Sequence, residues 1–392
     1  MKKKLLIVTP YYYPDIAANV NFIKEIVEEI KNDFSISIFA NEVRNPQIQK
    51  DKTEERNIFI YRCKNKFSKM PGLYSKIIEY IVFYIKCYLF IKNRADNFDI
   101  IFCQSTPPYA SIPIRLASKK ARIIYNVQDI FPDSLMLYLG NRKFTLLHKI
   151  EKISYQYSDI IIAISEGFKR KIQERSKNSK IYVIPNWVDS NKIFYKSNAK
   201  ERLPELNSYF NKDNINIVYS GNIGFGLDFD LILNAAKKMI DKNANFIIIG
   251  NGKAKRKLQK KINALKLNNV ILLPPFPHDY IADIYSFGDV YILPIKSNLL
   301  AGSYPSKTWS ILACGSPLVI SANKEMEFAK ELSESRLAYI SNPGDVDDFI
   351  NKIMIAKRNN RRDSDRIINI IKEIYCKEKL IKQYIYYINS II

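Results

Sequence analysis

Residues 299–322 read LLAGSYPSKTWSILACGSPLVISA, and the order of residue types in this stretch predicts a unit of an α/β fold. A loop of small residues runs into a short helix, Gly315 ends that helix, and Leu318–Ile320 is typical of a buried parallel strand. In Pro305–Lys307 the proline suits a first helical turn, and the serine can cap free amides. Those amides and the lysine would bind an anion such as a phosphate. Taken alone, an ordinary strand–helix unit with a lysine at its entrance fits equally well.

The composition of the chain limits its size class, its compartment and its partners. At 392 residues, of which 47% are apolar, the chain is long enough for two domains. Five scattered cysteines without a CxxC pair favour a reducing cytoplasm and argue against disulfides or a zinc site. The net charge of +22 implies an anionic partner. Nucleic acid, phosphorylated sugars and an anionic membrane all qualify.

Neither a signal peptide nor a membrane-spanning helix is expected. The apolar run after Lys2–Lys4 stops at Thr9-Pro10 without a small-residue cleavage site, which favours a first strand. A spanning helix needs a run of about 18 or more uncharged apolar residues, and the sequence has no such run.

Residues 74–94, YSKIIEYIVFYIKCYLFIKNR, form the most apolar helix that the sequence predicts. A helix that is apolar nearly all round is either buried in a core or pressed on lipid. Lysines flank it, as an interfacial helix on anionic lipid requires. The two interpretations can hold for different faces. The side chains expected at the membrane or the acceptor are Lys66, Lys69, Lys76, Tyr84 and Lys86.

The first half of the chain alternates strands and helices, which predicts a doubly wound parallel sheet. We expect strands at residues 4–9, 36–40, 58–62, 100–104, 122–126, 160–164 and 181–185, and a polar linker over 191–214. Ligands of such sheets bind at the carboxyl ends of strands. The small Ala17 and Ala18 lie in one loop there, and Asp129 lies in another. Asp129 could act as a base, hold a sugar hydroxyl or cap a helix, although Asp133 is the better cap candidate.

The second half repeats this order. We expect strands at residues 216–220, 246–250, 270–273, 289–294, 318–320 and 337–340, and helices over 345–356 and 361–389. Three glycines in Gly221–Gly226 allow close approach to a phosphate, although the loop has neither the Walker lysine nor GxGxxG spacing. With Lys253–Arg256 and Ser303–Lys307, this loop gathers amides, cations and small residues. Such a cluster predicts a diphosphate site, with Asp129 serving the acceptor from the other domain.

Seven stretches, taken in order, resemble the family 4 glycosyltransferases of the GT-B fold, and within them the WbuB-like group of O-antigen and capsule enzymes. The stretches are LLIVTPYYYPDIAANVNFIKEI, YNVQDIFPDS, IIAISEGFKRKI, YVIPNWVD, IVYSGNIG, FIIIGNGKAKRKL and YPSKTWSILACGSPLV. The resemblance implies an α/β structure of two doubly wound Rossmann-like domains facing across a cleft. Residues 1–195 would form the acceptor-side domain and residues 196–374 the nucleotide-sugar domain, with a helix over 375–392 crossing back to the first.

The resemblance also implies a retaining transfer from a nucleotide-diphosphate sugar, without a bound metal or other cofactor. Asp129 and Lys307 would be the catalytic residues. The implied donor-binding residues are Ala17, Ala18, Gly221, Asn222, Gly224, Lys255, Arg256, Phe276, Ser303, Ser306, Lys307 and Ser310.

Three features depart from the family pattern. Ala17-Ala18 stands where many members have two glycines, and Gln128 stands where many have a histidine before the aspartate. Gly302 and Ser310 occupy the positions of two glutamates, the second of which usually holds the nucleotide ribose. Ser310 or another residue would have to take that role here.

We therefore expect a glycosyltransferase that acts in the cytoplasm at the inner face of the plasma membrane. The expected donor is a UDP-sugar such as UDP-N-acetyl-fucosamine, and the expected acceptor is a polyprenyl-diphosphate-linked saccharide. Nucleic acid is not an expected partner, because the cations are spread through loops and helices. Two alternatives stay open: a sugar-nucleotide epimerase of the same fold, and a non-catalytic basic module that binds nucleic acid or membrane.

Overall fold

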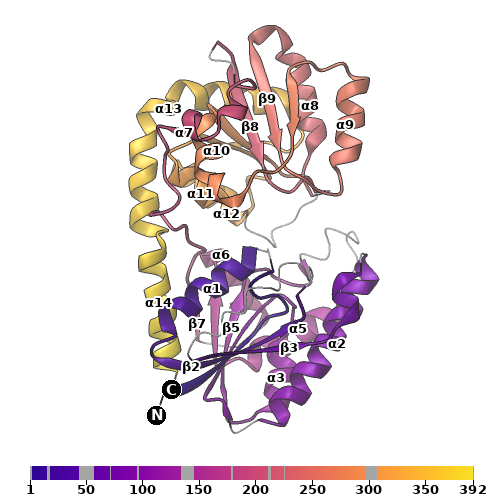
Figure 1. Ribbon diagram of the computed structural model, residues 1–392, viewed down its shortest axis with the longest axis vertical. Helices are drawn as coiled ribbons and strands as arrows, with labels where there is room; N and C mark the ends of the chain where they lie inside the picture. Colours follow the sequence, from indigo (N-terminus) through magenta and orange to yellow (C-terminus); the bar gives the residue numbers. More distant parts are fainter. Residues whose placement is uncertain are drawn as a thin grey trace. The chain divides into compact units, whose positions relative to one another are not determined.

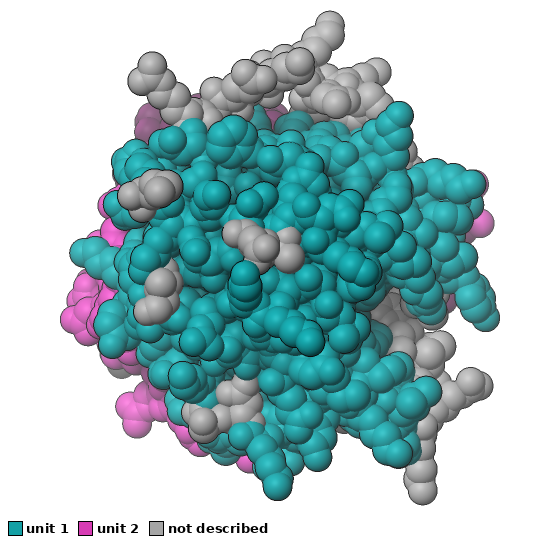
Figure 2. Space-filling model, turned by 90° about the horizontal axis from the view of Figure 1, so that it is seen from below, with its two compact units in different colours: residues 1–186, 302–304, 380–392 teal, residues 187–301, 305–379 magenta. Residues whose placement is uncertain are grey.

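The computed structural model describes residues 2–15, 18–43, 57–70, 72–94, 97–133, 145–177, 180–210, 213–224, 226–296, 305 and 307–391. These residues divide into two compact units (Figure 1). The first contains the described residues up to Asn186 together with those from Leu380 onward, coloured teal in Figure 2. The second contains the described residues from Trp187 to Lys379. The division thus falls earlier than the boundary expected after residue 195.

The first unit is built on a seven-stranded parallel sheet in the order β3-β2-β1-β4-β5-β6-β7. Its strands are β1 (Lys3–Val8), β2 (Phe34–Asn41), β3 (Ile58–Cys63), β4 (Ile100–Gln104), β5 (Arg122–Val127), β6 (Ile160–Ala163) and β7 (Ile181–Val183). Runs such as IIFCQ in β4 and IIIA in β6 are buried throughout, because both faces of the sheet are covered. The order of strands reverses between β1 and β4, which places the loops after these strands at the switch point where ligands bind.

Helices cover both faces of this sheet. One face packs against α2 (Leu73–Lys92), α3 (Ser111–Ala117), α5 (Thr145–Gln156) and α6 (Glu166–Arg175). Phe102 alternates with the core residues Ile101 and Cys103 and points to the other face. There it meets Tyr384 of α14 (Lys377–Ser390), whose ring also packs edge-on against Phe22 of α1 (Ala18–Ile30). The C-terminal helix is therefore part of the core of the first unit.

The second unit is built on a six-stranded parallel sheet in the order β10-β9-β8-β11-β12-β13. Its strands are β8 (Ile215–Ser220), β9 (Ala244–Ile249), β10 (Val270–Leu273), β11 (Val290–Pro294), β12 (Leu318–Ser321) and β13 (Tyr339–Ser341). Its helices are α7 (Ala199–Arg202), α8 (Phe229–Lys238), α9 (Lys255–Ala264), α10 (Ile281–Phe287), α11 (Thr308–Ala313), α12 (Glu327–Glu334) and α13 (Val346–Ile374). The order reverses between β8 and β11, so the doubly wound prediction is confirmed for both sheets.

Two local predictions differ from the structure. The stretch 191–214, expected as a linker, packs into the second unit: Leu203 and Leu206 are buried, and Arg202 donates to Asp283 at 2.8 Å. The helices expected over 345–356 and 361–389 are divided elsewhere, because α13 continues without interruption to Ile374. The break comes where Val188 bonds Tyr375 and Lys377 through backbone groups, which diverts them from the helix ladder.

Tyr384→Ala tests the seating of α14. Tyr384 is fully buried, and its hydroxyl donates to Asn126 at 3.3 Å, so its removal leaves a cavity under the sheet. We expect a loss of about 3–5 kcal/mol in the unfolding free energy, measured by urea denaturation. Tyr386→Ala, in the same helix but with a side chain that is 66% exposed, is the matched control and should change stability little. Equal effects of the two substitutions would contradict this packing.

Candidate functional site

The residues expected around a diphosphate lie at the carboxyl ends of β8, β9 and β11 in the second unit. Lys307 directly precedes α11 and is half-buried. Its ammonium donates to the Ser220 carbonyl at 2.8 Å and to the Tyr219 hydroxyl at 3.2 Å, and it lies 4.4 Å from the centre of the Tyr219 ring. Among the described residues no carboxylate pairs with it. Burial lowers the pKa of the Lys307 ammonium to about 8.

Glycines allow the loops below Lys307 to cross in contact. A Cβ on Gly221 would lie 2.0 Å from the Lys307 ammonium nitrogen, and a Cβ on Gly250 would lie 1.9 Å from the Gly221 carbonyl oxygen. A Cβ on Gly252 would lie 2.3 Å from the Ile223 carbonyl oxygen. All three glycines have φ between +144° and +157°, a backbone conformation that other residues avoid. The two loops therefore hold each other, and together they hold the lysine.

The crossing of the two loops occupies some of the backbone amides that we expected the glycine loop to present to a ligand. The amide of Gly221 donates to Ile249 and that of Ile223 donates to Asn251, at 2.9 and 2.8 Å. Within the described part of the chain, the amides of Asn222 and Gly224 bond no acceptor and stay available. From Gly221 to Gly224, every second backbone amide is therefore available to bind a ligand.

The basic residues after β9 divide in the same way. The Lys255 ammonium donates to the Gly250 carbonyl at 3.0 Å, so this cation supports the loop crossing. Arg256 is exposed on the first turn of α9 and forms no ion pair with a described residue. Phe276, after β10, and Ser310, in α11, are partly exposed. Helix α11 has only six residues, so its dipole contributes less than expected, and Lys307 carries most of the positive charge.

Three predicted donor-binding residues, Ala17, Ser303 and Ser306, lie outside the described residues. Ala18 begins α1, and its side chain is likewise outside the description.

In the first unit, Asp129 follows β5 in a loop held by Ser105. The Ser105 hydroxyl accepts the backbone amides of Gln128 and Asp129 at 2.9 and 3.0 Å. The Asp129 carboxylate pairs with no described cation, and burial raises its pKa to about 6. Asp133, four residues later, instead pairs with Arg175 at 2.8 Å. Asp129 is thus the carboxylate of this loop that has no described ion-pair partner and can contact a ligand.

The residues expected at the membrane point in different directions. The Lys76 ammonium turns inward to Glu79, at 2.7 Å, and to the Tyr11 hydroxyl. The Tyr84 hydroxyl donates to the Pro108 carbonyl, and the Lys86 ammonium donates to the Lys64 carbonyl. Lys66 is exposed above the Phe67 ring, and the Lys69 side chain lies outside the description. Lys76, Tyr84 and Lys86 therefore have partners within the first unit, and contact of these residues with a membrane or an acceptor stays a prediction.

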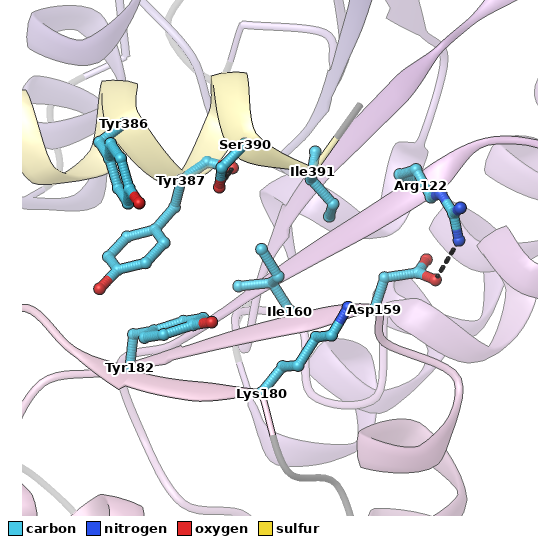
Figure 3. Close-up of a pocket in the computed structure, with 9 residues that line it drawn as sticks. All are labelled: Arg122, Asp159, Ile160, Lys180, Tyr182, Tyr386, Tyr387, Ser390 and Ile391. Carbon is cyan, nitrogen blue, oxygen red and sulfur yellow. Dashed lines mark hydrogen bonds and ion pairs between the residues drawn. The ribbon is translucent and has the colours of Figure 1, made fainter.

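A pocket of about 350 Å³ opens at the amino ends of β5, β6 and β7 (Figure 3). Arg122 and Asp159 pair across one side at 3.3 Å, and residues of α14 line the other side. Tyr182 and Tyr387 stack on each other there, with ring centres 4.0 Å apart. Because ligands of doubly wound sheets bind at the carboxyl ends of strands, we assign this pocket no part in the chemistry.

Sequence reasoning missed four residues that build the site: Ser105, Tyr219, Gly250 and Gly252. The two glycines follow the run FIII directly, and a GxG after a buried strand was a signal of close backbone approach. Tyr219 lies within a buried strand, and Ser105 lies at the end of another. No local pattern separates either residue from an ordinary core or turn position.

Comparisons with known proteins agree with this architecture. The model described as Glycosyltransferase Family 4 matches residues 20–192, and that described as Glycosyl transferases group 1 matches residues 206–373. WcaI of Escherichia coli, a glycosyl transferase assigned to colanic acid biosynthesis, is 23% identical over 351 residues, which cover 83% of this chain and 85% of WcaI. Sucrose-phosphate synthase of Thermosynechococcus elongatus superposes with a TM-score of 0.80 at 13% identity, covering 99% of each chain. HepE of Anabaena, solved with UDP, gives 0.75 at 14% identity and covers 99% of this chain and 100% of its own.

The fold and the two matched domains define a glycosyltransferase of the GT-B class. More narrowly, the chain belongs to the family 4 glycosyltransferases, as the sequence resemblance predicted.

Two glycine substitutions should have different effects, because Gly250 allows the two loops to cross and Gly221 leaves room for the Lys307 ammonium. In Gly250→Ala the new Cβ meets a backbone carbonyl that cannot move, so we expect a stability loss above the roughly 1–3 kcal/mol of backbone strain. In Gly221→Ala the Cβ meets the mobile end of Lys307. This variant should lose nucleotide affinity and lose less stability than Gly250→Ala, as urea denaturation and calorimetry would measure. A reversed order of stabilities would contradict the geometry.

Asp129→Asn should stabilise the first unit at neutral pH. A folded pKa of about 6 lies above the ordinary value of about 3.9, so stability falls as pH rises from about 4 to 6 and the penalty is full above that range. Removing the charge should raise the unfolding free energy at pH 7 by about 1–3 kcal/mol and have little effect at pH 4. Asp133→Asn, which breaks the pair with Arg175, should lower stability at pH 7. Destabilisation by Asp129→Asn at pH 7 would refute this account.

Proposed function

We propose that the chain transfers a sugar, with retention, from a nucleotide-diphosphate sugar to a polyprenyl-diphosphate-linked saccharide during synthesis of a bacterial surface polysaccharide such as O-antigen or capsule. The observation that supports binding of the nucleotide-diphosphate sugar is the buried Lys307 ammonium, which lies above the crossed glycine loops. It is a cation without a carboxylate partner in the described chain, beside two unbonded amides. Such a set matches the charge and the acceptor oxygens of a diphosphate.

The proposed chemistry needs stabilisation of a leaving group. As the bond between the sugar and the diphosphate breaks, negative charge grows on the leaving oxygen, and a fixed cation nearby lowers the barrier. Lys307 is our candidate for this cation, and we propose that the reaction uses no metal ion or other cofactor. The acceptor hydroxyl forms the new bond and loses its proton, and Asp129, with a pKa near 6, is a suitable acceptor of that proton.

UDP is the proposed nucleotide, because HepE has been solved with UDP and with UDP-glucose. N-acetyl-fucosamine stays our proposal for the sugar, on the sequence resemblance alone. The role of WcaI in colanic acid biosynthesis supports a surface polysaccharide as the product.

The proposal for the acceptor rests on the exposed face of α2. Among the described residues no helix is long and apolar enough to cross a bilayer. Yet α2 exposes a stripe of six large side chains, Tyr74, Ile77, Ile78, Ile81, Ile85 and Leu89. The exposed cations Lys64, Lys66, Lys92 and Arg94 lie before the start and at the end of α2 in the sequence. An apolar stripe with flanking cations suits the surface of an anionic membrane, here the inner face of the plasma membrane, where a polyprenyl-linked acceptor would be held.

Lys307→Met tests the donor site. With UDP as the probe, loss of one charged hydrogen-bond donor should weaken binding about 10–100-fold at pH 7 in titration calorimetry, and transfer should fall with it. Affinity of the parent protein should also fall as pH rises through about 8, where Lys307 loses its proton, and this dependence should vanish in the variant. The fold should survive, because burial disfavours the charged lysine.

Lys260→Met, on the exposed side of α9, removes the same charge and should leave binding nearly unchanged. Equal losses in the two variants would show that net charge, and not a diphosphate site, attracts UDP. Binding of GDP or ADP in place of UDP, with the same dependence on Lys307, would overturn only the choice of nucleotide.

A further inference from the structure

A carboxylate is buried on the side of α2 opposite the exposed stripe. Glu79 is 1% exposed, and it accepts hydrogen bonds from the Tyr11 hydroxyl at 2.5 Å, from Lys76 at 2.7 Å and from Asn41 at 3.3 Å. Its own backbone carbonyl accepts a bond from Asn65 at 3.0 Å. A buried charge held by this many donors fixes the position of the helix that carries it.

The partner of Glu79, Tyr11, lies in the loop between β1 and α1. This loop leaves the sheet at the switch point and leads directly to Ala17-Ala18. Other bonds hold the same loop: the Thr9 hydroxyl donates to the Tyr11 carbonyl at 3.0 Å, and the backbone amide of Asn41 in β2 donates to the Pro10 carbonyl at 3.1 Å. The Tyr11–Glu79 bond is thus a direct link from α2 to a loop where ligands of this fold bind.

We propose that Glu79 is a positioning residue that couples contact of α2 with an anionic lipid surface to the β1–α1 loop, so that lipid contact orders the acceptor side of the site. The inference rests on the proposed docking of α2. Glu79 and the exposed Ile77, Ile78 and Ile81 belong to the same turns of one helix, so a displacement of the stripe moves the carboxylate. The loop follows, because leaving a buried carboxylate or its donor unpaired is strongly unfavourable.

Lys76 gives the coupling a defined chemistry. Its ammonium contacts Glu79 and the Tyr11 hydroxyl and lies over the rings of Tyr11 and Tyr80, at 4.6 and 4.9 Å. The carboxylate, the phenol and the ammonium form one network that spans helix and loop. If Glu79 only neutralised the charge of Lys76, contact of α2 with lipid would leave the β1–α1 loop unchanged.

Hydrogen exchange of the full chain, with and without vesicles, tests this coupling. The probe is a vesicle of phosphatidylglycerol and phosphatidylcholine, and a vesicle of phosphatidylcholine alone is the neutral control. In the parent protein, anionic vesicles should slow exchange both in residues 73–92 and in residues 9–15. In Glu79→Gln, residues 73–92 should still be protected, whereas residues 9–15 should exchange about 10–100-fold faster and ignore the vesicles.

Glu28→Gln, at a half-buried carboxylate of α1 paired with Lys31, makes the same chemical change and should behave as the parent. If Glu79→Gln does not fold, Tyr11→Phe removes only the hydroxyl and should give the same loss of coupling. Failure of vesicles to protect residues 73–92 would overturn the docking and the inference together. Protection of those residues without a response of residues 9–15, or an equal response in Glu79→Gln, would overturn the coupling alone.

Discussion

The second domain depends on the crossing of two backbones beneath Lys307. The β8–α8 and β9–α9 loops pass so closely that Gly250 has no room for a side chain above the Gly221 carbonyl. This crossing fixes the Ser220 carbonyl, which in turn holds the lysine at 2.8 Å. The ammonium is therefore positioned by neutral backbone and by the Tyr219 ring, and not by a carboxylate. The charge of this ammonium is therefore not neutralised by a carboxylate, and its lowered pKa is the consequence of burial without a counter-ion.

The first domain holds a negative charge in the same way as the second domain holds the positive charge of Lys307. Ser105 holds the backbone of Asp129, and the carboxylate itself stays desolvated without a described cation beside it. Other buried carboxylates are compensated: Glu151 bonds Arg175, and Asp283 bonds Arg202. In a compensated pair the partner offsets the cost of burying the charge, whereas uncompensated groups with shifted pKa values concentrate where ligands bind. This contrast separates Asp129 and Lys307 from the many other charged residues of the chain.

The sequence predicts elements whose signals are local. Strands such as β4 and β6 are short branched runs that only a covered sheet accommodates, and Gly315 adopts the positive φ expected after a helix. Signals that depend on tertiary partners were not readable. The helix break at Tyr375 arises from pairing with Val188, far away in the sequence, and the inward turn of Lys76 arises from Glu79 and Tyr11. The sequence predicts which loops form the site. It does not predict which of their backbone amides stay unbonded, because that depends on how the two loops cross.

Helix α2 departs from the usual distribution of polarity on a surface helix at two places. It buries Glu79 with Lys76 against it, and it turns Ile77, Ile81 and Ile85 outward. Burial of each such apolar side chain contributes about 1.5–3 kcal/mol, so leaving the stripe in water forgoes much of the stabilisation that its residues could supply. Burial of a charge adds an unfavourable term that only its hydrogen bonds offset. An apolar partner for the stripe would recover this free energy, and a lipid surface supplies one over the whole length of the helix. In the proposed docking the placement of Glu79 has a physical reason, because the carboxylate ties α2 to the β1–α1 loop through Tyr11.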